Sequence, residues 1–223
     1  MTPLDVFITG STGYIGSRLV PALRARGHRV YTIVRPGSEA KAPDGAISVV
    51  GNVLSRDSIA AAIPRGAVVV HLIGTPRPSP AKAAQFEALD FPAARECIAA
   101  AETAGARRFV YVSVAHPAPV MHAYIDARVR VEQLLRESPL PCTILRPWYV
   151  LGPGHRWPYF LIPIYWLLRA LPSTRDGARR LGLVTIRQMV RALVGAVETA
   201  DDESRALGVE EIRRSTNATT AAG

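Results

Sequence analysis

A glycine-rich segment near the N-terminus constrains the fold of this chain more than any other feature. Residues 4–9 form a short apolar run that ends in Thr9, and the sequence Gly10-Ser11-Thr12-Gly13-Tyr14-Ile15-Gly16 follows. Residues 14–26 then carry apolar side chains at helical spacing, with Gly27 as a C-terminal stop. A strand that turns through glycines into a helix is typical of a site for a phosphate group, because the helix N-terminus presents free N–H groups.

The three glycines of this turn have separate expected roles. Gly10 permits the tight turn, Gly13 lets a pyrophosphate approach the backbone, and Gly16 lets the helix pack close to the sheet. We predict that the turn binds a dinucleotide. The predicted contacts are Gly10, Ser11, Thr12, Gly13, Tyr14, Ile15 and Gly16.

The rest of the chain alternates between strand and helix patterns. Further strands are expected at 30–34, 47–50, 68–73, 109–114 and 142–145. Helices are expected from near Asp57, placed to cap its helix, to Ile63, over 81–104 with a possible break at Pro92, and over 122–137. This alternation predicts an α/β fold, a Rossmann-type doubly wound parallel sheet with helices on both faces.

The pattern changes after Arg146-Pro147. A loop at Gly152-Pro153-Gly154 precedes the apolar stretch 157–168, and an amphipathic helix is expected over about 185–199. We therefore expect a dinucleotide-binding core over 1–150 and, over 151–200, a small helical lid and C-terminal helix integrated with the core. Residues 201–223 are expected to form a partly flexible tail.

Composition excludes several classes of protein. The chain has 223 residues, of which 48% are hydrophobic and 20% charged, so it can bury a core and general disorder is excluded. No stretch supplies the roughly 20 apolar residues of a membrane-spanning helix. The N-terminus lacks a basic region followed by an apolar one, which predicts no secretory signal and a cytoplasmic protein. Cys97 and Cys142 lie among apolar neighbours and are expected to be reduced core residues.

The positive charge is spread along the chain. The net charge is +9, and of the 27 basic residues only Lys41 and Lys82 are lysines. The longest basic runs are pairs such as Arg107-Arg108, whereas a nucleic-acid-binding protein concentrates its charge on one face or tail. We therefore expect no nucleic-acid partner, and an anionic cofactor or substrate would need only a few of these arginines.

The motifs together resemble a known group, the atypical and extended short-chain dehydrogenase/reductases, also called the NAD-dependent epimerase/dehydratase family. Within it the chain is most similar to small NAD(P)H-binding members related to the nucleotide-binding accessory subunit of respiratory complex I. The resemblance is carried by Thr9 to Gly16, Gly51-Asn52-Val53, Val69 to Gly74, Val112-Ser113-Val114, Leu145-Arg146-Pro147 and Gly152-Pro153-Gly154. It implies further cofactor contacts from Asn52, Val53, Ile73, Gly74, Thr75 and Pro147.

The end of the second predicted strand bears on the choice of cofactor. An acidic residue about 20 positions beyond the glycines would bind the ribose of NAD, whereas an arginine can receive the 2′-phosphate of NADP. Arg35 stands at this position and no acid precedes Glu39. This favours NADP, with NAD as the alternative if Arg35 is only a surface arginine.

The resemblance also implies a catalytic group. Family enzymes use a tyrosine with a lysine four residues later, and a serine at the end of the preceding strand. Ser113 and Tyr124 stand in these positions, but the residue four after Tyr124 is Arg128. Arg128 can keep a positive charge and a ribose contact, yet its pKa of more than about 12 excludes it from a proton relay. Tyr124 could therefore be an acid, a cofactor contact or a structural residue.

These observations lead to an expected function with open alternatives. We expect an NAD(P)-binding oxidoreductase, with a non-catalytic NAD(P)H-sensing or assembly protein as the alternative and a sugar-nucleotide epimerase or dehydratase ranked lower. No metal site is expected, because His71, His116 and His122 lack ligand spacing. The stretch 157–168 could line a pocket for an apolar or aromatic substrate, form a homodimer interface, or contact a membrane surface.

Overall fold

The structure is a computed structural model that describes residues 2–76, 78–153, 180–200 and 202–215. Its centre is a parallel sheet of seven strands in the order β3-β2-β1-β4-β5-β6-β9. A small second sheet pairs β7 with β8 in parallel. The strands are β1 (Asp5–Thr9), β2 (Arg29–Val34), β3 (Ile47–Val50), β4 (Val68–His71), β5 (Arg108–Val112), β6 (Cys142–Leu145), β7 (Tyr149–Leu151), β8 (Leu183–Thr185) and β9 (Arg205–Leu207).

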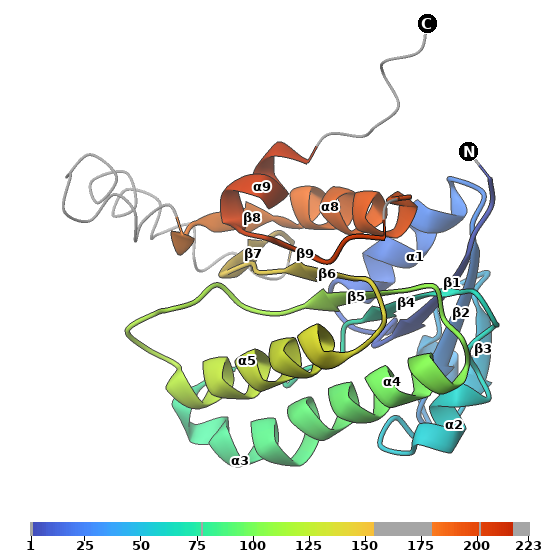
Figure 1. Ribbon diagram of the computed structural model, residues 1–223, viewed down its shortest axis with the longest axis horizontal. Helices are drawn as coiled ribbons and strands as arrows, with labels where there is room; N and C mark the ends of the chain where they lie inside the picture. The colour runs from blue at the N-terminus through green and yellow to red at the C-terminus, as the bar shows by residue number, and fades with distance from the viewer. Residues whose placement is uncertain (1, 77, 154–179, 201, 216–223) are drawn as a thin grey trace, which may run out of the picture.

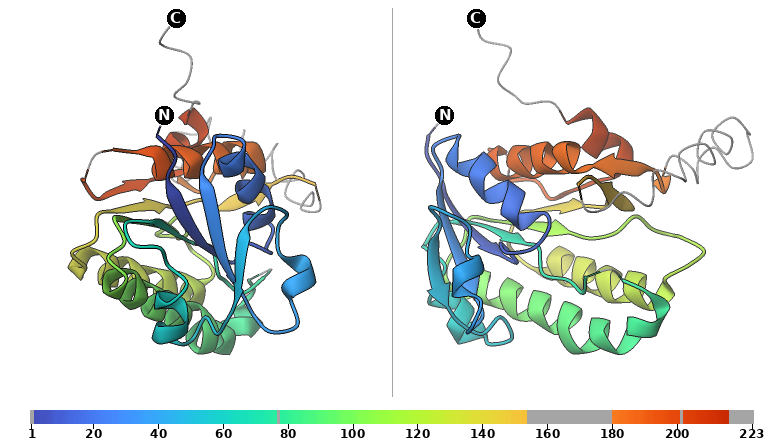
Figure 2. Two further views of the ribbon diagram at one scale, coloured as in Figure 1. Left: turned by 90° about the vertical axis from the view of Figure 1, so that its right-hand side faces the viewer. Right: turned by 180° about the vertical axis from the view of Figure 1, so that it is seen from behind.

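Helices cover both faces of the large sheet (Figures 1 and 2). One face carries α1 (Gly16–Arg24), α8 (Ile186–Glu198) and α9 (Val209–Arg214), and the other carries α2 (Arg56–Ala60), α4 (Phe91–Thr103) and α5 (His122–Glu137). Short segments complete the chain: η1 (Glu39–Lys41), η2 (Pro80–Lys82), α3 (Ala83–Gln85) and the π-helix η3 (Phe86–Asp90). This arrangement confirms the predicted doubly wound α/β fold.

The central strands are buried on both sides, which explains their continuous apolar runs. Side chains alternate along β1, so that Val6 and Ile8 pack towards α1 and α8 while Phe7 packs towards α2 and α4. The two hydrophobic clusters on opposite faces fix the sheet, and therefore fix the loops that leave the carboxyl ends of its strands. Those loops carry almost every candidate site residue.

Some helix boundaries differ from those predicted from the sequence. Ser55, not Asp57, caps α2: its hydroxyl accepts a hydrogen bond from the Ser58 N–H at 3.4 Å. The segment expected as one helix over 81–104 is divided into η2, α3, η3 and α4. Pro92 lies in the first turn of α4, directly after the π-helical segment η3.

The C-terminal region adds elements that the sequence did not indicate. Strand β9 extends the large sheet beside β6, and α9 packs against α8, both within the range expected as a tail. Helix α8 begins one residue later and ends one residue earlier than expected and packs against α1, with Thr185 and Gln188 forming a capping box. The apolar stretch 157–168 lies outside the described residues.

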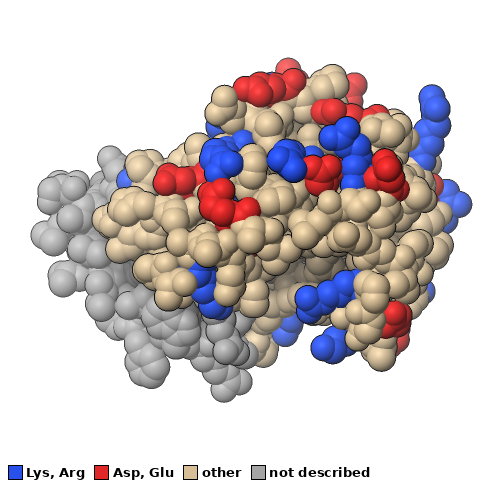
Figure 3. Space-filling view, turned by 90° about the horizontal axis from the view of Figure 1, so that it is seen from below, with Lys and Arg blue, Asp and Glu red and all other residues tan. Residues whose placement is uncertain are grey.

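The described helices are all too short or too polar to cross a membrane. Cys97 and Cys142 are free and buried, as predicted. On the face drawn in Figure 3, basic and acidic side chains are interspersed and do not form a single basic patch. The scatter of arginines along the sequence is thus retained on this face of the folded molecule.

Candidate cofactor site and active site

The glycine-rich turn between β1 and α1 is folded tightly against the sheet. Gly10 has φ +74°, and a Cβ atom there would lie 2.9 Å from the backbone carbon of Leu72, so only glycine fits. A Cβ atom on Gly16 would overlap the backbone of Gly10 and Ser11. The conformation of Gly10 agrees with its predicted place in the tight turn, whereas Gly16 is packed against the backbone of the turn itself.

The tip of the turn is the part that faces outward. The Ser11 hydroxyl is buried and accepts a hydrogen bond from Thr32 at 2.5 Å, which anchors the turn to β2. Thr12 and Gly13 are exposed, and α1 begins three residues after Gly13. The turn leaves β1 where the chain reverses the order of strand addition, since β1 lies between β2 and β4. An exposed glycine turn at such a switch point fits a dinucleotide pyrophosphate.

The neighbouring residues of the turn are fixed by other contacts. Arg18 donates a hydrogen bond to the Tyr14 carbonyl at 2.7 Å, and its guanidinium lies 4.3 Å from the centre of the Tyr14 ring. A Cβ atom on Gly152 would overlap the Tyr14 hydroxyl, so this loop approaches the turn closely. Ile15 is the N-cap residue of α1 without a side-chain cap.

The other predicted cofactor residues lie at the same carboxyl edge of the sheet. Arg35 directly follows β2, is exposed, and its Nε donates to Ser38 Oγ at 3.3 Å. Beyond β3, the Asn52 N–H donates to Ser58 Oγ at 2.9 Å. The set is completed by Val53 beyond β3, Ile73, Gly74 and Thr75 beyond β4, and Pro147 beyond β6. Contact of these residues with a cofactor stays a prediction.

Arg128 is held by a network at the ends of β4 and β5. One terminal nitrogen donates to the Tyr111 hydroxyl at 3.2 Å and to the Val112 carbonyl at 3.0 Å. The other donates to Asp90 Oδ2 at 3.0 Å. Burial alone would lower the pKa of Arg128, but the neighbouring phenols and the Asp90 carboxylate raise it overall, so the guanidinium stays charged.

This network leaves Arg128 little capacity for other partners. Its Nε is buried and makes no hydrogen bond with the described residues. The guanidinium also lies against Gly74, where a Cβ atom would overlap it. Asp90 is satisfied from the other side, because Oδ1 accepts from the Thr75 N–H at 2.8 Å and from the Thr75 hydroxyl at 2.7 Å. Arg128 thus ties the loop after β4 to α5.

Tyr124 stands one helical turn before Arg128 on α5. Its ring centre lies 5.1 Å from the Arg128 guanidinium and 5.1 Å from the Phe86 ring centre. The ring is half-buried, unlike that of Tyr111, where burial raises the pKa to about 12 although Arg128 acts to lower it. Between the two phenols beside Arg128, Tyr124 is the one with access to solvent.

Ser113 belongs to a second network, centred on Glu132. The Ser113 hydroxyl donates to Glu132 Oε1 at 2.6 Å, and Arg146 donates to both Glu132 oxygens. Arg136 donates to Oε2 at 3.2 Å, and His116 Nε2 lies 3.4 Å from Oε1. Burial would raise the pKa of Glu132, but the bonds from Arg146 and Ser113 lower it overall. Ser113 therefore directs its proton into the protein.

Two carboxylates that organise the site, Asp90 and Glu132, were not among the residues predicted from the sequence. A signal for Glu132 exists: Tyr124, Arg128 and Glu132 are spaced four residues apart and so share one face of α5. Asp90 precedes Phe91-Pro92 in an apolar segment and carries no such signal. Its pairing with Arg128 joins residues 38 positions apart, which only the fold brings together.

His71 lies in the core below the site. Its Nδ1 is 2.9 Å from Thr9 Oγ1, and its ring stacks on Phe109. Burial, followed by the charge of Arg128, lowers the pKa of His71 to about 3, so it is neutral at ordinary pH. Within the described ranges there is no group of three potential metal ligands.

Comparison with known proteins gives a consistent result. Residues 10–155 match the family described as NAD(P)H-binding. A 3-diazoavenalumate denitrifying reductase from Streptomyces is 33% identical, over 88% of this chain and 73% of that protein. A ceramide reductase from Caulobacter vibrioides is 30% identical, over 67% of this chain and 47% of that protein.

The fold also matches solved structures. The enzyme WbmH of Bordetella bronchiseptica, in complex with NAD⁺, superposes with a TM-score of 0.69 at 21% identity, over 94% of this chain and 79% of that one. Three observations agree with NAD(P)H binding: the geometry of the glycine turn, the doubly wound sheet and the family match. The chain belongs to the NAD(P)H-binding family.

Proposed function

We propose that this protein is an NAD(P)H-dependent reductase in which Tyr124 is the proton donor. The observation that carries the proposal is the position of a solvent-accessible phenol directly beside a buried, permanently charged guanidinium, at the same sheet edge as the glycine turn. A positive charge stabilises the phenolate that remains after proton donation. The names of the Streptomyces and Caulobacter relatives, both reductases, support reduction as the direction.

Each residue has a defined part in this proposal. The Thr12–Gly13 tip would hold the pyrophosphate of the dinucleotide, which supplies a hydride when bound. Tyr124 would give a proton to the substrate atom that gains negative charge. Arg128 would stabilise the phenolate without exchanging protons, because its pKa is raised. Since Ser113 donates to Glu132, it would offer the substrate an acceptor and not a proton.

The test of this function separates binding from chemistry. Replacing Tyr124 with Phe should leave cofactor affinity nearly unchanged and lower the reduction rate by about 10²–10⁴-fold, since only the hydroxyl is lost. Binding is measured by calorimetry and turnover by oxidation of reduced cofactor with a panel of aldehydes, ketones and quinones. The control is Tyr31→Phe, which removes a phenol from β2. Turnover of Tyr124→Phe at the wild-type rate would exclude Tyr124 as the acid.

We further propose that NADP is the preferred cofactor, with Arg35 binding the 2′-phosphate. Arg35 is exposed at the end of β2, and the nearby Glu39 carboxylate already accepts the Gly37 N–H at 3.1 Å. Arg35→Asp should weaken NADP binding by roughly 2–4 kcal/mol and NAD binding far less. Calorimetric titration of both cofactors measures the difference. Equal losses would place Arg35 outside the phosphate site.

A second function is favoured by one specific observation. Because Arg128 replaces the family lysine and is bound to Asp90, Tyr111 and Val112, the proton relay of the family is missing. A protein that binds NAD(P)H as a sensor or assembly factor needs no such relay. Arg128→Lys should then create no activity, whereas in an enzyme it should keep or raise activity. Cofactor binding without turnover across the whole panel would favour the sensor.

A further inference from the structure

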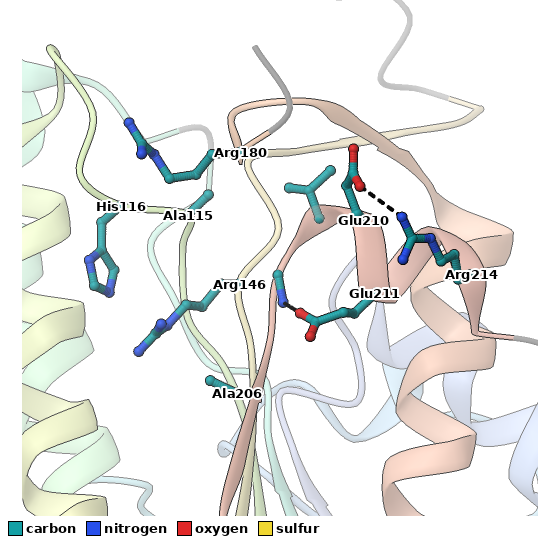
Figure 4. Close-up of a pocket in the computed structure, with 10 residues that line it drawn as sticks. Ala115, His116, Arg146, Arg180, Ala206, Glu210, Glu211 and Arg214 are labelled. Carbon is teal, nitrogen blue, oxygen red and sulfur yellow. Dashed lines mark hydrogen bonds and ion pairs between the residues drawn. The ribbon is translucent and has the colours of Figure 1, made fainter. Parts of the chain in front are cut away.

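A cavity of about 530 Å³ opens beside the Ser113 end of β5. Its walls come from the loop after β5, from the residue after β6, and from the junction of β9 and α9 (Figure 4). Ala115 and His116 follow Ser113 by two and three residues, and the Ala115 N–H bonds to the Pro147 carbonyl at 2.9 Å. The cavity therefore adjoins the candidate active site. None of its lining residues is among the candidate cofactor-binding or catalytic residues.

The two walls of this cavity differ in charge. Figure 4 shows Arg146 and Arg180 extending towards the side that carries His116. The opposite wall carries Glu210 and Glu211, and both carboxylates are engaged. Glu210 pairs with Arg214 at 3.0 Å, and Glu211 accepts the Gly208 N–H. Within the described residues, neither of these carboxylates pairs with Arg146 or Arg180.

Arg146 is oriented so that part of its guanidinium remains available. Its Nε and one terminal nitrogen bind Glu132, which also receives the Ser113 hydroxyl. The remaining terminal nitrogen makes no hydrogen bond with any described residue. Arg180 is exposed, and no hydrogen bond or ion pair with the described part of the chain holds it. Two guanidinium groups thus present unused donors to one cavity.

We propose that this cavity binds the anionic group of the substrate, a carboxylate, between Arg180 and the free nitrogen of Arg146. The proposal rests on the proposed reductase function, because it places the reactive part of the same substrate towards Ser113 and Tyr124. A planar carboxylate matches guanidinium donors. A singly charged group is favoured over a phosphate dianion, because Arg146 already balances Glu132 and two further carboxylates line the opposite wall.

The experiment compares acids with their uncharged counterparts. Protein saturated with NADP⁺ is titrated by calorimetry with short alkyl and aryl carboxylates, with their methyl esters, and with inorganic phosphate. We expect the best acid to bind at least about tenfold more tightly than its ester, since the ester loses a charge-assisted bond. Arg180→Gln should remove about that factor for the acid only. Its matched control is Arg107→Gln, an exposed arginine at the opposite edge of the sheet.

Each other outcome overturns a defined part of the proposal. Equal affinity for acids and esters, no binding of any carboxylate, or full affinity in Arg180→Gln would exclude the anion site. Tighter binding of phosphate than of every carboxylate would exclude the carboxylate assignment. The cofactor is titrated alone beforehand: if it does not bind, the reductase function fails, and the carboxylates are then titrated on cofactor-free protein. The two failures are therefore distinguishable.

Discussion

Two buried carboxylates organise the site, Asp90 from η3 and Glu132 from α5, and they have different roles. Asp90 is closed in: it and its partner Arg128 expose 1% and 6% of their side chains. Glu132 is equally buried, but its partners Arg146 and His116 expose 26% and 22% and line the open cavity. A sealed ion pair holds elements together, whereas an open one can present its outer nitrogen atoms to a ligand.

The contrast explains why the arginine at position 128 is a positioning residue. Its guanidinium donates to groups from η3, β5 and the segment after β4, so it fixes three parts of the site at once. A lysine has three donors on a flexible stem, so it would keep the positive charge beside Tyr124 but not all four of these hydrogen bonds. The substitution relative to the family pattern is thus accommodated by Asp90 and by the glycine at position 74.

The largest expected effect tests whether the Asp90 cluster, formed by Asp90, Arg128, Tyr111 and Thr75, is closed to solvent. Asp90→Asn removes the charge that balances a guanidinium buried in the protein, and it should lower the free energy of unfolding by about 3–5 kcal/mol. Urea denaturation measures this loss. The control is Asp126→Asn, an exposed carboxylate on α5 that should change stability by less than about 0.5 kcal/mol. A similar small change for Asp90→Asn would contradict the structural role.

A smaller effect is expected at the Glu132 cluster, formed by Glu132, Ser113, His116, Arg136 and Arg146, which opens to the cavity. Glu132→Gln keeps the shape of the side chain, and the cations that lose their partner, Arg146 and Arg136, can reach solvent. The free energy of unfolding should therefore fall by about 1–3 kcal/mol. The same variant should weaken carboxylate binding, because Arg146 is no longer oriented. If Glu132→Gln destabilises the protein more than Asp90→Asn does, the distinction between the two clusters is wrong.

A third effect, smallest when it is expressed per pH unit, is a pH dependence in the core beneath the Asp90 cluster. The pKa of His71 is about 3 in the folded protein and about 6.5 in the unfolded chain. Because the unfolded chain takes up this proton first, stability should fall as the pH is lowered from about 6.5 towards 3, by up to about 1.4 kcal/mol per pH unit. Urea titrations at pH 7 and pH 5 measure this slope. His71→Asn should flatten it, and an unchanged slope would assign the dependence to other groups.

The sequence made the glycine turn between β1 and α1 predictable for a local reason. Gly10, Gly13 and Gly16 lie within one turn between a strand and a helix, so their spacing reports backbone geometry directly. The alternation of apolar strands and helices likewise predicted the doubly wound sheet. Strand β9 escaped prediction because Arg205, Ala206 and Leu207 are too few and too polar to show a strand pattern, and pairing with β6 alone makes them a strand.

The tertiary structure decided which residues contact the candidate catalytic side chains. Tyr124, Arg128 and Ser113 were identified from their positions, but their partners Asp90, Glu132 and Arg146 come from other elements. Charge pairing depends on distance in space, and residues far apart in sequence meet only after the sheet and helices have packed. The sequence by itself therefore determined the fold and the glycine turn. Only the tertiary structure determined that Arg128 is buried in an ion pair with Asp90, whereas Arg146 and Arg180 line the cavity.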